Sequence, residues 1–335
     1  MQQQRRKVLQ QLGLGLAGAT LGGFGLSARA QAQANSAAYP SRAVRVVYPY
    51  QAGGTGDVVA RQIAEGLAKA WCKPVIVDNR PGAGGMIGAD MVAKAEPDGH
   101  TLLLTLTGMV QAPSLYSKAT YNPVRDFAPI SELGTSNLAL VVQPSLGVSS
   151  VKQLIDYIGK QGKPLAYGSY GLGSSGHLYM EIFARNTKVA LTHVPYKGEA
   201  PLINDLLGGQ LPAGMIAAVS ARQHAATGKL RVLAVAGAAR SPLLPDAPTF
   251  AEAGVRGLDR QGWVGMFAPA ATPRAIVEKI SADVNRTLAN PDFRARMVDL
   301  GIVLKGSTPA AFADVVKAEQ IYWAEAIRAS DIRLD

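Results

Sequence analysis

The stretch VRVVYPYQAGGTGDVVAR, residues 44–61, determines how the fold begins. Residues 44–48 are β-branched or aromatic apart from one arginine, and they predict a buried strand. A glycine-rich turn, GGTG at residues 53–56, comes next, and a helix is predicted to open at Asp57. The first amides of a helix have no partner within the helix. A turn without bulky side chains at that point therefore predicts an anion-binding site.

The first 34 residues have the pattern of an export signal. RRK at residues 5–7 precedes an apolar run at residues 12–26, and overlapping Ala-x-Ala cleavage motifs follow up to Ala34. The run is too short and too rich in glycine to predict a membrane-spanning helix. We expect a periplasmic protein whose leader is cleaved between Ala30 and Ala34, and the arginine pair fits either general secretory or twin-arginine export. Free nucleotide is scarce there, which favours a small carboxylate at the first turn.

Without the leader the chain keeps 30 basic and 24 acidic side chains, a formal charge of +6. The basic residues are scattered rather than interleaved with aromatic residues, which argues against nucleic acid as a partner. A mild positive charge attracts acidic solutes. The one cysteine, Cys72, excludes an internal disulfide. It follows the first predicted helix, where glycine is the usual cap, and we expect a partly buried, inert thiol.

Short apolar strands alternate with amphipathic helices along the rest of the chain, which predicts an α/β fold with parallel sheets. A unit of strand, glycine turn and helix occurs twice, so we expect two lobes with a ligand cleft at the carboxyl ends of their strands. Strands are expected at residues 44–48, 75–77, 101–106, 138–142, 165–167, 191–194, 230–235 and 263–268, and helices at 57–70, 86–95, 151–160, 177–186, 199–207 and over most of 273–329.

The second glycine turn, GSYGLGSSGH at residues 168–177, matches the dinucleotide pattern G-x-G-x-x-G through Gly171, Gly173 and Gly176. The pattern also requires an acidic residue about twenty positions later, and PYK at residues 195–197 stands there instead. Three interpretations remain: a dinucleotide site, a plain turn, and a second anion-binding turn. We favour the last, with hydroxyl donors from Ser169, Ser174 and Ser175.

The sequence contains few of the groups that catalysis or metal binding requires. No Gly-x-Ser-x-Gly motif surrounds these serines, and the four histidines lack the spacing of metal ligands. Abundant donors with few tunable acids or bases predict binding without turnover, with no metal and no cofactor. Asp57 is interpreted as a helix cap or a ligand group, and His177 as a packing residue or a ligand contact. Tyr50 and Tyr196 could each close over a ligand, and Tyr196 could equally be buried with its hydroxyl bonded.

Many short motifs in a fixed order make the chain similar to the Bug-type extracytoplasmic solute receptors of tripartite tricarboxylate transporters. The resemblance covers nearly the whole mature chain. The motifs are Pro49 with residues 53–55 and Asp57, VDNRPGAGG at 77–85, PDGHT at 97–101, GSYGLGSSGHL at 168–178, HVPYKG at 193–198, DLLGGQ at 205–210, LRVLAV at 230–235, LPDAPTFAEAG at 244–254, and Trp263 with residues 268–269.

The resemblance implies a monomeric two-lobed receptor with the periplasmic-binding-protein fold of type II, which closes on a small carboxylate and delivers it to a membrane permease. Lobe 1 would comprise residues 35–142 and 263–335, and lobe 2 residues 143–262, with hinges near Val142 and Trp263. In the family, backbone groups and waters at the two glycine turns hold the carboxylate. The positions that take this role by resemblance are Gly53, Gly54, Thr55, Ser169, Gly173, Ser174 and Ser175, and further Tyr50, Asp57, Thr105, His177 and Tyr196.

The chain departs from the family pattern at several of these places. Ala52 stands where proline is usual, Gly56 where Thr, Ser or Asn is common, and Cys72 where glycine is common. After DLLGGQ the family has a hydrophobic residue and then Asp, whereas LPAG at 211–214 lacks the acid. This argues against an amino-acid ligand, whose ammonium group an acid there would meet.

Two alternatives to a transport receptor stay open at this point. The first is an exported α/β enzyme with a phosphate- or nucleotide-containing cofactor, because twin-arginine export carries proteins that fold around cofactors. The second is a binding module whose partner is another protein, such as a signalling kinase, rather than a permease.

Overall fold

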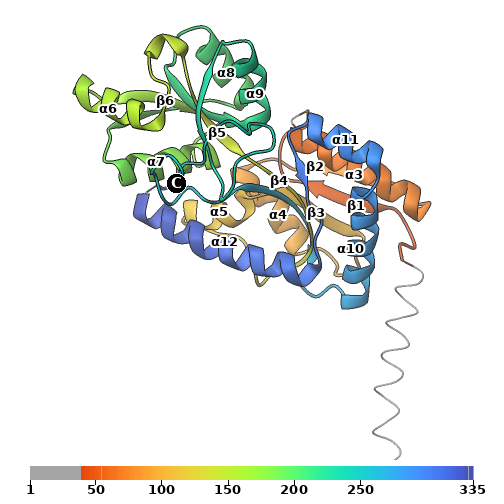
Figure 1. The fold of residues 1–335 in the computed structure, drawn as a ribbon. Helices are drawn as coiled ribbons and strands as arrows, with labels where there is room; N and C mark the ends of the chain where they lie inside the picture. Colours follow the sequence, from red (N-terminus) through yellow and green to blue (C-terminus); the bar gives the residue numbers. More distant parts are fainter. Residues whose placement is uncertain (1–38, 54, 331, 335) are drawn as a thin grey trace, which may run out of the picture.

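The chain forms two sheets that lie side by side, each with helices packed against it (Figure 1). The computed structural model describes residues 39–53, 55–330 and 332–334. The predicted leader, its cleavage motifs and Gly54 therefore lie outside the described residues. One sheet has six strands in the order β11-β4-β10-β3-β1-β2, and the other has five in the order β7-β6-β8-β5-β9. We call the parts built on them the six-stranded half and the five-stranded half.

The six-stranded half contains the strand that was expected at residues 44–48. β1 (Val44–Tyr48) pairs in parallel with its neighbours on both sides, and its valines are buried because helices cover both faces of the sheet. The other strands are β2 (Val75–Asn79), β3 (Thr101–Leu106), β4 (Phe127–Ser136), β10 (Gly262–Pro269) and β11 (Val303–Leu304), and the helices are α3 (Thr55–Trp71), α4 (Met86–Ala93), α5 (Gly108–Leu115), α10 (Arg274–Leu288) and α11 (Pro291–Asp299).

The five-stranded half repeats the arrangement of strand, glycine turn and helix. Its second helix, α7, is capped by Ser174, whose hydroxyl accepts from the amide of His177. The strands are β5 (Leu138–Val142), β6 (Leu165–Ser169), β7 (Leu191–Pro195), β8 (Ala213–Ala217) and β9 (Arg231–Val235), and the helices are α6 (Val151–Gln161), α7 (Ser175–Thr187), α8 (Glu199–Leu207) and α9 (Ala218–Ala226).

Every strand expected from the sequence is present, but the sheets are mixed rather than parallel. β10 runs antiparallel to β3 and β4, and β5 runs antiparallel to β8 and β9. The reversed strands are the ones that follow a crossing. β5 is the first strand after the chain leaves the six-stranded sheet, and β10 is the first strand after it leaves the five-stranded sheet.

The first crossing between the halves lies before β5, not after Val142 as the resemblance implied. β4 ends at Ser136 in the six-stranded sheet and β5 begins at Leu138 in the five-stranded sheet, so Asn137 is the crossing residue. Asn137 is buried, and its side-chain amide donates to the carbonyl of Ala236 at 2.7 Å. The chain returns before β10, close to the expected Trp263.

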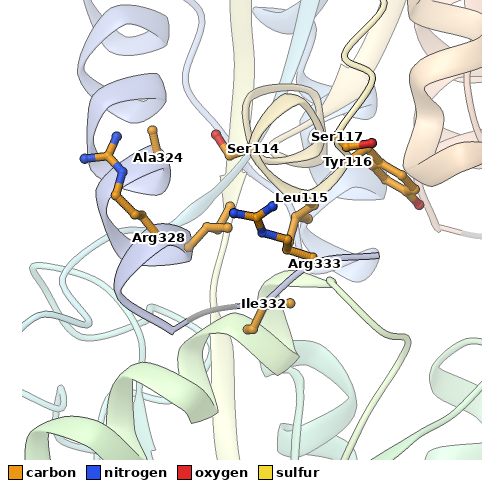
Figure 2. A pocket seen from close by; sticks show the side chains of 9 residues that line it. Ser114, Leu115, Tyr116, Ser117, Ala324, Arg328, Ile332 and Arg333 are labelled. Carbon is orange, nitrogen blue, oxygen red and sulfur yellow. The ribbon is translucent and has the colours of Figure 1, made fainter. Parts of the chain in front are cut away.

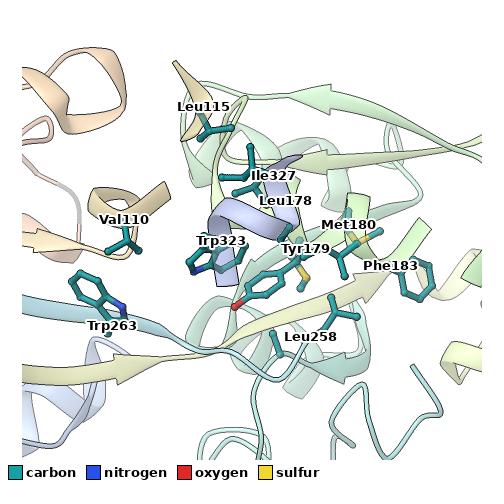
Figure 3. Packing of buried hydrophobic residues seen from close by; sticks show 14 of the residues in the cluster. Val110, Leu115, Leu178, Tyr179, Met180, Phe183, Leu258, Trp263, Trp323 and Ile327 are labelled. Carbon is teal, nitrogen blue, oxygen red and sulfur yellow. The ribbon is translucent and has the colours of Figure 1, made fainter. Parts of the chain in front are cut away.

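The last helix, α12 (Pro309–Ser330), contacts both halves (Figure 1). It packs against α5 and β4 on one side and against α7 on the other. Trp323 on α12 is fully buried, with its ring 5.2 Å from that of Tyr179 on α7. Leu115 and Val110 of α5 belong to the same apolar cluster (Figure 3). One hydrophobic core therefore runs through both halves, beside a separate core in each.

None of the helices within the described ranges is long and apolar enough to cross a membrane.

Candidate ligand-binding site

The first glycine turn is held in shape by the carboxylate of Asp57. The amide of Gly53, which has a φ of 89°, donates to Asp57 Oδ2 at 3.0 Å. Arg61 donates to both carboxylate oxygens, and Asn79 donates to Oδ1 at 2.9 Å. Burial alone would raise the pKa of Asp57, but these hydrogen bonds outweigh it and lower the pKa. The ionised side chain thus closes the turn and has its acceptor positions filled. Of the two sequence interpretations, this geometry favours a structural role.

The space that a side chain at position 56 would need is filled by Tyr48. A Cβ atom on Gly56 would overlap the Tyr48 hydroxyl and lie 2.8 Å from its Cζ atom. Tyr48 belongs to β1 and is buried, and its ring lies 5.3 Å from that of Tyr50. The departure from the family pattern at Gly56 is therefore matched by an aromatic residue beneath the turn. Thr55 is the first residue of α3.

Tyr50 links the first turn to the start of another helix. Its ring lies against the backbone of Gly85, and its hydroxyl lies against Gly108, where a Cβ atom would come within 2.8 Å of it. Burial raises the pKa of Tyr50 to about 12, and a hydrogen bond from Thr105 opposes that rise. Thr105 is itself buried at the end of β3. The structure thus brings together two residues that the sequence analysis had named separately.

Helix α5 follows directly, and the sequence analysis did not predict it. Its start lacks a capping side chain and its interior contains Pro113, so neither of the usual helix signals is present. Gln111 in its first turn is buried, and its Nε2 atom lies 3.0 Å from the hydroxyl oxygen of Ser175. Ser175 begins α7 in the other half. Of the two residues in this contact, the sequence analysis had named only Ser175, as a hydroxyl donor of the second glycine turn.

The first turns of three helices therefore form one chain of contacts. Tyr48 and Tyr50 connect the start of α3 to the start of α5, and Gln111 connects α5 to the start of α7. Each helix follows the carboxyl end of a strand: β1, β3 and β6. Helix N-termini carry partial positive charge, so this junction of the two halves favours an anion.

In the second glycine turn, most of the predicted donors are bonded within the turn itself. Ser169 is fully buried; its hydroxyl pairs with His193 Nε2 at 2.8 Å and donates to the carbonyl of Gly171. Ser174 donates to the same carbonyl at 2.6 Å. Of the three serines, Ser175 is the one whose hydroxyl contacts the other half.

The glycine amides of this turn do not form a cradle for a pyrophosphate. Gly171 donates to Ser169 and Gly173 to His177 Nδ1, while Gly176 donates to the hydroxyl of Tyr170 at 3.2 Å. A dinucleotide would need these donors free. The geometry does not fit such a cofactor, and within the described residues no group of His, Cys, Asp or Glu side chains is placed to hold a metal ion.

His177 and His193 are stacked beneath the turn, with ring centroids 3.9 Å apart and planes 8° from parallel. Burial lowers the pKa of each to about 4, and for His193 the neighbouring His177 lowers it further. Both rings are therefore neutral at pH 7. The neutral form is required because His177 Nδ1 must accept the hydrogen of Gly173. His177 thus shapes the turn, which supports its interpretation as a packing residue.

Tyr196 points away from this junction. Its hydroxyl donates to Asp205 Oδ2 at 2.6 Å in the same half. The hydroxyl is therefore bonded, as one alternative expected, but the side chain is half-buried rather than buried, and the structure gives no support for a contact with ligand.

Cavities lie elsewhere in the described part of the chain. One of about 320 Å³ lies between the end of α5, α12 and the C-terminal segment, with Arg328 and Arg333 at its border (Figure 2). The other, about 750 Å³, lies in the five-stranded half between α6, α9 and the loop at residues 243–248. Neither is lined by a residue that the sequence analysis placed in the site. Of the predicted site residues, Tyr50 and Ser175 take part instead in the contact chain between the first turns of α3, α5 and α7.

Two mixed sheets joined by crossing segments, with helix N-termini at their junction, define a two-lobed α/β binding protein. The model of the tripartite tricarboxylate transporter family receptor matches residues 59–327. The chain belongs to this family. A relative from Pseudomonas sp. strain P51, the UPF0065 protein in the tcbD-tcbE intergenic region, is 38% identical over 87% of each chain.

Solved structures show the same relationship. The periplasmic binding protein BugD is 35% identical, with a TM-score of 0.76 over 88% of this chain and 99% of its own. R. palustris Rpa4515 with adipate is 34% identical, with a TM-score of 0.78 over 88% and 99%. MatC from Rhodopseudomonas palustris with bound malate is 33% identical, with a TM-score of 0.75 over 86% and 100%. The expected family and the two-lobed α/β fold are both confirmed.

Proposed function

We propose that this chain is an exported receptor that captures a small carboxylate where its two halves meet and delivers it to the membrane permease of a tripartite tricarboxylate transporter. The observation that carries the proposal is the contact chain joining the first turns of α3, α5 and α7. The adipate and malate in the related structures are both small carboxylates. A carboxylate held there would interact with three helix N-termini at once.

Binding is proposed to occur without turnover. Ser169 and His193 are a hydrogen-bonded pair whose serine is fully buried. Asp57 is held by Arg61, Asn79 and Gly53. Ser169 is closed off from solvent and donates its hydrogen to the carbonyl of Gly171, so we propose that these groups hold the turns in shape rather than attack a substrate.

The halves are proposed to move relative to each other about the crossings at Asn137 and between Leu258 and Gly262. The amide of Gly237 donates to the carbonyl of Leu258, and the amide of Trp263 donates to Thr107 Oγ1 at 2.8 Å. A ligand that contacts both halves favours the arrangement in which they are together. We propose further that the receptor acts as a monomer and that a permease recognises its ligand-bound form.

A thermal-shift screen tests the function. The mature protein is unfolded in denaturant and refolded, so that no solute remains from expression, and is then mixed with adipate, malate, benzoate, glutamate and glucose in turn. A ligand specific for the folded state raises the melting temperature with its concentration. We expect a shift with at least one carboxylate and none with glucose. A protein that responds to none of the acids, or equally to glucose, contradicts the proposal.

A further inference from the structure

The cavity of about 320 Å³ is bounded by three segments that are distant in sequence. Its lining comes from the end of α5, the last turns of α12 and the C-terminal segment at residues 332–334 (Figure 2). Two of the lining side chains are arginines, Arg328 on α12 and Arg333 on the C-terminal segment. No acidic side chain is among the described residues that line it. The cavity therefore carries two positive charges that its described lining does not neutralise.

The two guanidinium groups are available to a ligand. Both arginines are exposed, and neither forms a hydrogen bond or an ion pair with another described residue. In Figure 2 they extend from two different segments, and the Ser114 hydroxyl projects from α5 on the side of α12. A guanidinium presents its N–H donors as a planar fork that matches an oxyanion. The lining thus combines two such forks with a hydroxyl group.

The charge of the cavity decides which kind of ligand it suits. α5 and α12 both end beside it, and the C-terminus of a helix is equivalent to about half a negative charge. The two guanidinium charges outweigh these two helix ends, so an anion is favoured over a cation. The last carbonyl groups of a helix have no partner within the helix and can accept hydrogen bonds. The ligand that fits best accepts from the arginines and also donates to a carbonyl group.

We propose that this cavity is a second anion site, separate from the solute site, and that its ligand is inorganic phosphate. Phosphate keeps at least one hydrogen at neutral pH, so it can accept from Arg328 and Arg333 and donate to a helix carbonyl. Sulfate has the same tetrahedral shape but no hydrogen, and an ionised carboxylate can only accept. The cavity of about 320 Å³ has room for phosphate with several waters, because one water occupies about 30 Å³.

The site also acts on the contact between the halves. The amide of Leu334 donates to the carbonyl of Leu115 at 2.9 Å, which joins the C-terminal segment to the end of α5. Its side chain lies at the second glycine turn, where a Cβ atom on Gly173 would come within 2.6 Å of Leu334 Cδ1. The C-terminal segment therefore contacts both halves. A phosphate held by Arg328 and Arg333 fixes this segment to α12 and keeps α5 beside the turn. This effect on the solute rests on the receptor function proposed above, whereas phosphate binding itself does not.

The first test measures phosphate binding by calorimetry and by thermal shift, in a phosphate-free buffer with chloride at equal ionic strength as the reference. The variants are Arg328→Gln, Arg333→Gln and the double variant. Arg296→Gln is the matched control, because Arg296 on α11 is exposed and its variant loses the same charge away from the cavity. We expect phosphate to stabilise the wild-type protein more than sulfate does. Each single variant should weaken phosphate binding about three- to tenfold, and Arg296→Gln should leave it within about twofold.

The second test measures the coupling to the solute. Adipate, malate and benzoate are titrated into the refolded protein to find an acid that binds, and the titration is repeated with saturating phosphate. We expect phosphate to strengthen the binding of that acid about fivefold in the wild-type protein and to have no effect in the double variant. If phosphate instead weakens it equally in both proteins, phosphate competes at the solute site and the second site is rejected.

The remaining outcomes are equally decisive. An equal response to sulfate would overturn the assignment to phosphate. No response beyond that to chloride, with a lower ligand-free melting temperature in the arginine variants, would mean that the arginines pair with Asp331 and Asp335, their neighbours in sequence. The site would then be rejected. A wild-type protein that binds phosphate through the arginines but binds no acid would refute the receptor function and leave this site in place.

Discussion

Gln111 and Ser175 are hydrogen-bonded at 3.0 Å although they lie in the first turns of helices that belong to different halves of the molecule. Gln111 is buried, and the amide has both its nitrogen and its oxygen within hydrogen-bond distance of the same hydroxyl. A buried amide that lost this partner would be left unsatisfied. The pair therefore stabilises the contact of α5 with α7, independently of any solute.

We predict that Ser175→Ala and Gln111→Met each weaken solute binding about three- to thirtyfold, because the ligand must then hold the halves together without this bond. Calorimetric titration of the two variants and of the double variant gives a coupling energy. The double variant should lose less binding free energy than the sum of the two single losses, because each single change already removes the same hydrogen bond. Fully additive losses would show that the two side chains act separately.

The stacked histidines predict that stability falls in mild acid. His177 and His193 have pKa values of about 4 in the fold against 6.5 when unfolded. Between these values the unfolded chain binds more protons, so the free energy of unfolding decreases as pH falls from 6.5 to 4. Each histidine contributes a slope of up to roughly 1.4 kcal/mol per pH unit.

Urea unfolding at pH 7, 5.5 and 4.5 measures this effect against a variant. Carboxylates titrate in the same range, so the comparison is with His177→Asn, whose amide oxygen can still accept from Gly173. The variant should show a shallower decline than wild type between pH 6.5 and 4.5. Parallel curves would mean that His177 titrates normally in the fold.

Local patterns in the sequence were sufficient for the elements that position the two turns. β1, β3, β5 and α8 have the expected bounds, and the helices after both glycine turns begin within two residues of the expected start. The elements that were missed have weak local signals. β4 contains Pro129, Glu132 and Gly134 and pairs with β10 through irregularities, while α9 has no capping side chain. Tertiary packing decides these segments.

The predicted site was only partly recoverable, because the roles of its side chains depend on partners that are distant in sequence. The glycine turns and Tyr50 lie at or next to the first turns of α3, α5 and α7, and their role in binding stays a prediction. Asp57, however, is held by Asn79, 22 residues away, and Gln111 meets Ser175 across 64 residues. No spacing rule links such pairs. The direction of Tyr196, toward Asp205, has the same kind of cause.

Cys72 gives a prediction about stability. It follows α3 with a φ of 49°, a left-handed conformation that favours glycine, and it is exposed rather than partly buried as expected. Cys72→Gly should raise the free energy of unfolding by about 0.5–1 kcal/mol because glycine adopts this conformation without strain. Cys72→Ala is the matched control, since it removes the sulfur but keeps the Cβ atom. If alanine stabilises as much as glycine in urea unfolding, the gain does not come from the backbone.

The contact between Gly56 and Tyr48 predicts that a change at one position can be compensated by a change at the other. Gly56→Thr restores a residue that is common in the family, yet its Cβ atom would overlap the Tyr48 ring. Because Tyr48 is buried in β1 and has little room to move, we expect a loss of about 1–3 kcal/mol in stability. Tyr48→Val alone should also destabilise, by leaving a cavity.

The double variant Gly56→Thr with Tyr48→Val should recover much of both losses, because the valine vacates the space that the threonine occupies. The measurement is the free energy of unfolding of the four proteins in urea, combined as a double-mutant cycle. A favourable coupling above about 1 kcal/mol supports the exchange of volume between the two positions. If the losses in the free energy of unfolding are additive, the two substitutions destabilise the protein independently. Tyr48 would then not be the residue that fills the space of a side chain at position 56.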